Sequence, residues 1–86
     1  MYVIKLKEEV IMKSFEIMLD SINKVKTFVN IVAKCDYDVD LSSGRYVVDA
    51  KSIMGIFSLD LSKPIRIDIH GDEDGSFEAE IKEFIC

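Results

Sequence analysis

The sequence is most informative at residues 35–50, CDYDVDLSSGRYVVDA. In residues 35–41 apolar side chains alternate with aspartates in an unbroken two-residue period, which predicts a strand with one buried face. Residues 42–45, SSGR, predict a turn, because Gly44 adopts a positive φ at no steric cost. The side chains expected to face inward from the returning strand are Tyr46, Val48 and Ala50. The stretch is therefore predicted to be a β-hairpin.

Upstream of the hairpin, the sequence predicts a strand followed by a helix. Apolar and polar residues alternate over residues 14–19, with Phe15, Ile17 and Leu19 on the buried face. Asp20 or Ser21 then offers a helix N-cap. The helix is expected to run from residue 22 to about residue 34, and its buried stripe comprises Ile22, Val25, Phe28, Val29 and Val32.

Downstream, a short helix over residues 52–59 is separated from the next strand by Pro64. Residues 65–70 alternate as a fourth strand, residues 71–75 form an acidic loop, and the last helix buries Phe77, Ile81, Phe84 and Ile85. The order is β-α-β-β-α-β-α. We predict an α+β fold, an open-faced sandwich with the helices on one face of a four-stranded, largely antiparallel sheet.

Composition restricts the class of protein. The chain has 86 residues, 49% of them hydrophobic, which suits one domain. A net charge of −5 argues against a nucleic-acid partner. No apolar run approaches the roughly 18–20 residues that cross a bilayer, so we expect a cytoplasmic protein with no membrane partner. Cys35 and Cys86 are expected to be free thiols, and no metal site or cofactor is predicted.

The acidic residues gather in two clusters, and both are expected to be solvated faces. One cluster comprises Asp36, Asp38 and Asp40, and the other comprises Asp72, Glu73 and Asp74. The second cluster precedes the last helix, where the helix dipole favours negative charge. His70, the single histidine, stands at the end of the fourth strand and is expected to point to solvent.

The first eleven residues, MYVIKLKEEVI, are treated as an N-terminal extension to a domain at 12–86. Two interpretations stay open. The alternation of Tyr2, Ile4 and Leu6 with polar or smaller residues suits an extra edge strand. Alternatively, the extension is not native: codons for KEE can contain a purine-rich ribosome-binding sequence, and translation would then begin at Met12.

Two stretches carry a resemblance to a known family. Residues 51–59, KSIMGIFSL, and residues 34–41, KCDYDVDL, resemble HPr, the histidine-containing phosphocarrier of the bacterial sugar phosphotransferase system. The element order is also that of the family, and the resemblance covers residues 12–86. It implies the open-faced fold predicted above and a protein that carries phosphate without being an enzyme.

The chain departs from the family pattern at the phosphoacceptor motif, HARP. Counting back without a gap from Lys51 places Ser21 at the histidine, Asn23 at the arginine and Lys24 at the proline. Matching the first strand instead leaves the active loop short by a few residues. Either alignment removes the histidine, so the chain resembles a Crh-like member of the family. We expect Ser21 to be an N-cap, because phosphoserine is a stable ester that would not pass phosphate onward.

The second predicted helix carries the remaining candidate site. Ser52 suits a helix N-cap. It also matches the serine that HPr kinase modifies, which implies regulatory phosphorylation beside Lys51. Ile56 and Leu59 are expected to cover the sheet, whereas the opposite arc, Ile53, Met54 and Phe57, is expected to bind a protein partner. The alternative is that the last helix or the N-terminal segment covers this arc.

The leading hypothesis is a regulatory or adaptor domain without histidine phosphotransfer. Its candidate partners are HPr kinase, a transcriptional regulator and phosphotransferase components. The alternatives are a phosphocarrier that uses a non-standard acceptor such as His70, and a structural or assembly domain.

Overall fold

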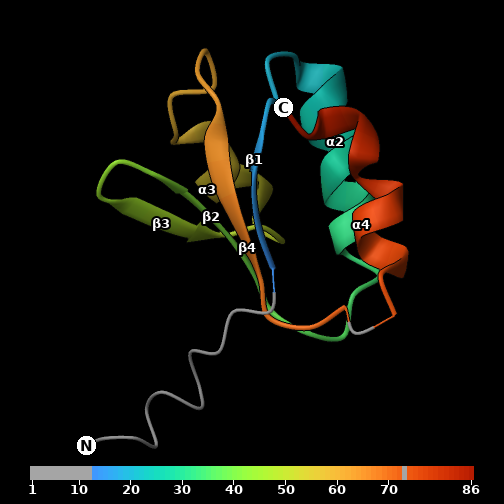
Figure 1. Ribbon diagram of the computed structural model, residues 1–86. Helices are drawn as coiled ribbons and strands as arrows, with labels where there is room; N and C mark the ends of the chain where they lie inside the picture. The colour runs from blue at the N-terminus through green and yellow to red at the C-terminus, as the bar shows by residue number, and fades with distance from the viewer. Residues whose placement is uncertain (1–12, 73) are drawn as a thin grey trace, which may run out of the picture.

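The computed structural model describes residues 13–72 and 74–86. The predicted extension, residues 1–11, and Met12 lie outside the described residues. The elements follow the predicted order, and their bounds are β1 (Lys13–Ile17), α2 (Ile22–Val32), β2 (Val39–Ser43), β3 (Tyr46–Asp49), α3 (Ile53–Phe57), β4 (Ile65–Ile69), α4 (Ser76–Glu80) and the 3-10 helix η1 (Lys82–Phe84) (Figure 1).

The four strands form one antiparallel sheet in the order β1-β4-β2-β3. In β4 the three isoleucines, Ile65, Ile67 and Ile69, are buried on one face, while Arg66 is exposed on the other. Side chains from α2, α3 and α4 share a single core with these isoleucines. The helices therefore cover one face of the sheet, as predicted, and the other face is open.

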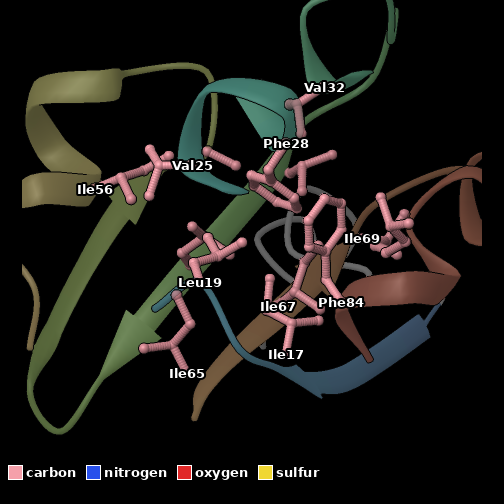
Figure 2. Close-up of a cluster of buried hydrophobic side chains, with 14 of the residues drawn as sticks. Ile17, Leu19, Val25, Phe28, Val32, Ile56, Ile65, Ile67, Ile69 and Phe84 are labelled. Atoms are coloured by element: carbon pink, nitrogen blue, oxygen red, sulfur yellow. The ribbon is translucent and has the colours of Figure 1, made fainter. Parts of the chain in front are cut away.

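The longest helix of the described residues, α2, supplies much of the core. Val25, Phe28 and Val32 are fully buried at three- and four-residue spacing. The Phe28 ring meets Phe84 of η1 edge to face, with centroids 5.8 Å apart (Figure 2). This arrangement places an aromatic pair where α2, η1 and the sheet converge.

The predicted strand over residues 35–41 is wrong in its first half. Residues 33–38 form turns and bends, and β2 begins at Val39. The reason is that the Cys35 N–H donates to the Val32 carbonyl at the end of α2, so this backbone belongs to the helix terminus. Tyr37 nevertheless packs inward, against Phe77. The alternation therefore predicted burial correctly and strand geometry incorrectly.

The hairpin is tighter than expected. Ser42 and Ser43 belong to β2, so only Gly44 and Arg45 form the turn, and Gly44 has the positive φ that the sequence predicts. Tyr46, predicted to face inward, is 72% exposed. β3 lies at one edge of the sheet. The side chains that bury Ala50 at the end of this strand do not extend to Tyr46 at its start.

Other features also differ from the predictions. Ile22, assigned to the buried stripe, is 61% exposed because the first turn of α2 extends past the packed core. β1 ends at Ile17, although Leu19 is still buried. The last helix divides into α4 and η1, and Ile85 forms an isolated bridge with Ile17 in place of a helical turn.

Candidate functional site

Ser21 stands at the N-terminus of α2 as a capping residue, as predicted. Its Oγ accepts a hydrogen bond from the Lys24 backbone N–H at 3.1 Å. The Lys24 ammonium pairs with Asp20 at 2.9 Å, and this hydrogen bond lowers the pKa of the Asp20 carboxyl. Asn23 is exposed in the first turn. The residues at this helix end are thus a hydroxyl, an amide and an ion pair, and no imidazole is among them.

Ser52 plays the same part for α3. Its Oγ accepts from the Gly55 N–H at 3.1 Å. A Cβ at Gly55 would lie 3.2 Å from both Ser52 Oγ and Val48 Cβ, so glycine lets the start of α3 approach β3 closely. The neighbouring Lys51 ammonium does not contact Ser52: it donates to the Cys35 carbonyl at 3.0 Å, which ties the end of α2 to the start of α3.

The apolar side chains of α3 divide into two sets. Ile56 is fully buried and Leu59, just beyond the helix, is 7% exposed. Met54 is 76% exposed and Phe57 is 43% exposed. Ile53 is half-buried and packs against the core, so it lies at the margin of the exposed set. We call Ile53, Met54 and Phe57 the α3 patch.

His70 does not point freely to solvent as expected. Its side chain is 16% exposed, and Nε2 lies 3.0 Å from the Asp40 carboxylate on β2. The reason is that β4 is an inner strand of the sheet, flanked by β1 and β2, so its end is not a mobile edge. Because His70 follows the buried Ile69 and pairs with Asp40, it belongs to the open face of the sheet, opposite the face that the helices cover.

The prediction of a solvated face is wrong for Asp72 of the second acidic cluster, which is buried, whereas Asp74 is exposed. Its carboxylate accepts from the Phe77 N–H at 2.8 Å and the Glu78 N–H at 3.1 Å, which caps α4. Lys13 pairs with it at 3.3 Å and with Glu78 at 3.1 Å, and Glu78 is the main cause that raises the pKa of Lys13. Sequence reasoning missed this network. The available signal was an aspartate shortly before a helix start.

The structure does not add a metal centre to these sites. Among residues 13–72 and 74–86, no three His, Cys, Asp or Glu side chains gather closely enough to hold a metal ion. Cys35 and Cys86 are free thiols, and burial raises the pKa of Cys35. None of the helices in the described part of the chain has the length and apolarity needed to cross a bilayer.

Comparison with known proteins identifies the family. The family model described as the PTS HPr component phosphorylation site matches residues 22–85, so the match begins at the first residue of α2. HPr-C-His from Thermoanaerobacter tengcongensis superposes with a TM-score of 0.71 at 26% identity, over 85% of this chain and 91% of that chain. The phosphocarrier protein HPr from Bacillus anthracis str. Ames superposes with a TM-score of 0.64 at 26% identity, over 84% and 93%.

Among curated protein sequences, none matches the chain. The family model covers most of the chain, and both solved structures share its fold over nearly their whole length. The order of elements, the open sheet and the capped helices agree with that assignment. This chain belongs to the HPr family of phosphocarrier proteins of the phosphotransferase system.

Proposed function

We propose that the chain is a Crh-like regulatory or adaptor member of the HPr family. It acts in the cytoplasm, binds protein partners through the α3 patch, is phosphorylated on Ser52 and does not transfer phosphate through a histidine. The observation that carries the proposal is Ser21 at the N-terminus of α2, where its hydroxyl serves as the cap.

The chemistry of serine at this position supports the absence of transfer. An imidazole titrates near neutral pH and forms a labile N–P bond, so it can accept a phosphoryl group and pass it on. A serine hydroxyl titrates far above neutral pH and forms a stable ester. Asn23 also lacks the permanent charge with which an arginine would hold a phosphate. Neither side chain therefore suits rapid reversible transfer.

The alternative, a phosphocarrier with His70 as its acceptor, finds little support in the surroundings of that residue. A phosphoryl group on Nε2 would take the place of the Asp40 contact at 3.0 Å and set two anionic groups against each other. The side chain is also mostly covered. Phosphorylation of His70 is therefore the competing result that a phosphorylation assay has to exclude.

Phosphorylation of Ser52 has local electrostatic support. Ser52 is exposed, and its Oγ already faces the Gly55 N–H. A phosphate on Ser52 would supply additional acceptor oxygens to the backbone N–H groups in the first turn of α3 that have no partner within the helix. Lys51 is the adjacent residue, and its ammonium donates to the Cys35 carbonyl. After phosphorylation of Ser52 the ammonium would instead pair with the phosphate dianion, which is a stronger acceptor than a neutral carbonyl.

The α3 patch has the character of a protein-binding surface. Met54 and Phe57 leave large apolar groups in water, and a methionine adapts its shape to different partners. A nucleic-acid partner is disfavoured by the net charge of −5. The candidate partners are HPr kinase, a transcriptional regulator and components of the phosphotransferase system.

A phosphorylation assay tests the absence of transfer. The protein is incubated with phosphoenolpyruvate and enzyme I, and separately with ATP and HPr kinase, and intact mass is measured. We expect an acid-stable adduct only from the second reaction. Ser52→Ala should abolish it, whereas Ser21→Ala should keep it. An acid-labile adduct from the first reaction, lost in His70→Ala, would establish the phosphocarrier alternative.

A capture experiment tests the α3 patch with HPr kinase as the probe. Met54→Asp and Phe57→Asp are compared with Thr27→Asp, which adds the same charge at an exposed position on α2. We expect the first two to weaken binding at least tenfold, because burying a carboxylate opposes association. Equal binding by all three variants would place the contact elsewhere.

A further inference from the structure

We infer that β3 pairs along its outer edge with β3 of a second copy of this chain, which gives a two-fold dimer with one continuous sheet. β3 is the last strand in the sheet order, and among the described residues it pairs with β2 alone. An exposed strand edge of this kind is a template for another strand. The inference does not depend on the proposed function.

The backbone register identifies which groups face outward. The Ala50 N–H donates to the Val39 carbonyl at 2.8 Å, and the two residues lie in the register that pairs Leu41 with Val48. Bonded and non-bonded pairs alternate along an antiparallel ladder. Tyr46 and Val48 therefore direct their backbone groups to β2, whereas Val47 and Asp49 direct theirs to the free edge, and Arg45 precedes them in the turn.

Charge selects one register for the dimer. In a two-fold antiparallel pairing of outward-facing residues, Val47 can lie opposite Val47 of the second copy. The turn residue Arg45, next to the start of β3, then comes level with Asp49 of the second copy, and the converse pair forms by symmetry. Opposite charges on directly opposed residues stabilise a sheet. A shift of two residues places Arg45 against Val47 or Lys51 and loses both pairs.

Exposed apolar side chains favour the same contact. Tyr46 is 72% exposed and Val47 is 65% exposed, so the free edge is flanked by apolar groups on both faces. In the proposed register Tyr46 lies opposite Val48 of the second copy on the helical side, and the two Val47 side chains meet on the open face. Aromatic and β-branched cross-strand pairs of this kind are favourable.

The other edge of the sheet explains why the assembly stops at two copies. There the chain end covers the second half of β1: Ile17 bridges Ile85, the Met18 N–H donates to the Phe84 carbonyl at 2.9 Å, and the Cys86 N–H donates to the Glu16 carbonyl at 2.9 Å. In the dimer the free edge of β3 is already paired, and the edge of β1 is partly covered by the chain end. Further copies are therefore not expected to extend the sheet.

The test reverses the charges at Arg45 and Asp49 and measures self-association by sedimentation equilibrium. Protein concentrations run from about 10 µM to about 1 mM, the range in which weak, small interfaces dissociate. We expect the mass of the native chain to rise from 9.8 kDa toward twice that value. Arg45→Asp and Asp49→Arg should each weaken self-association at least about tenfold, because each opposes like charges twice. An equimolar mixture should restore the dimer, because every charge pair is then opposite.

A second variant covers the case in which Asp49→Arg does not fold, since Asp49 also accepts from the Lys51 N–H. Val47→Pro removes an outward N–H and leaves the bonds to β2 in place, so it should also abolish the dimer. Circular dichroism establishes that each variant is folded. A native chain that stays monomeric at 1 mM, or a dimer that survives Val47→Pro, would overturn the inference, as would folded charge variants that fail to associate when mixed.

Discussion

The helices α2 and α3 begin in the same way and serve different ends. Each starts at a serine whose Oγ accepts a backbone N–H at 3.1 Å. α2 has eleven residues and buries Val25, Phe28 and Val32, whereas α3 has five residues and buries only Ile56. A cap therefore starts a helix, whereas the residues that pack beneath the helix determine whether it stabilises the core or exposes its side chains to solvent.

The largest expected effect breaks the contribution of α2 to the core. Phe28→Ala should lower the free energy of unfolding by about 3–5 kcal/mol, because it removes a buried ring that packs on Phe84. Met54→Ala on α3 should change it by less than about 0.5 kcal/mol, because that side chain is mostly in water. Urea unfolding measures both, and a comparable loss in the two variants would show that another part of the chain covers Met54.

The next effect divides α3 itself. Ile56→Ala should cost about 2–5 kcal/mol, since Ile56 is fully buried against the core. Phe57 is 43% exposed, so Phe57→Ala should lower the free energy of unfolding by clearly less, although the side chain that it removes is larger. The same urea titrations compare the two, and a reversed order would mean that Phe57 and not Ile56 anchors α3.

Removal of the two caps sharpens the comparison further. Ser21→Ala and Ser52→Ala should each cost about 1 kcal/mol, because each leaves a first-turn N–H without its acceptor. For the five-residue α3 we expect the loss to appear as faster amide hydrogen exchange confined to that helix. For α2, which carries the core, it should appear in global unfolding. Faster exchange across the whole chain in Ser52→Ala would contradict this division.

The smallest effect is a loss of stability at alkaline pH, and it comes from titratable side chains in the segment that follows α2. No matching effect is expected from α3, which contains no titratable side chain. Burial raises the pKa of Cys35 above its ordinary 9.0, and burial followed by the Cys35 hydrogen bond raises the pKa of Tyr37 above 10.0. Both groups are neutral when protonated, and the unfolded chain releases these protons first. Their stabilisation is therefore complete below pH 9 and declines as the pH rises further.

Thermal unfolding between pH 8 and pH 11 measures this decline. Tyr37→Phe keeps the ring that packs on Phe77 and removes the hydroxyl. Its melting temperature should therefore fall less steeply with pH than that of the native chain. Parallel slopes in the two proteins would exclude Tyr37 as a source of the alkaline dependence.

Local patterns predicted the elements well where a periodic run ended at a recognisable cap or turn. Phe28 and Val32 were assigned to the core from helical spacing, and Ile67 and Ile69 from alternation. Ser21 was recognised as a cap from its type and place. These features depend on residues a few positions apart, so a single sequence contains the necessary information.

The candidate site was predictable only in part. Met54 and Phe57 were assigned to an uncovered arc because a short helix on an open sheet has one side to bury, and both are exposed. His70 was misjudged, because its contact with Asp40 joins residues thirty positions apart. The pairing of Lys13 with Asp72 spans most of the chain and left no local trace.

The order of elements, the family and the lack of a histidine at the start of α2 all follow from the sequence. The packing of the elements, in contrast, sets which patterned faces are covered: Ile22 and Tyr46 are left in water, Asp72 is buried, and β1 lies against the chain end while β3 keeps an open edge. The physical reason is that periodicity records which side of an element is apolar, whereas burial depends on where that element meets its neighbours.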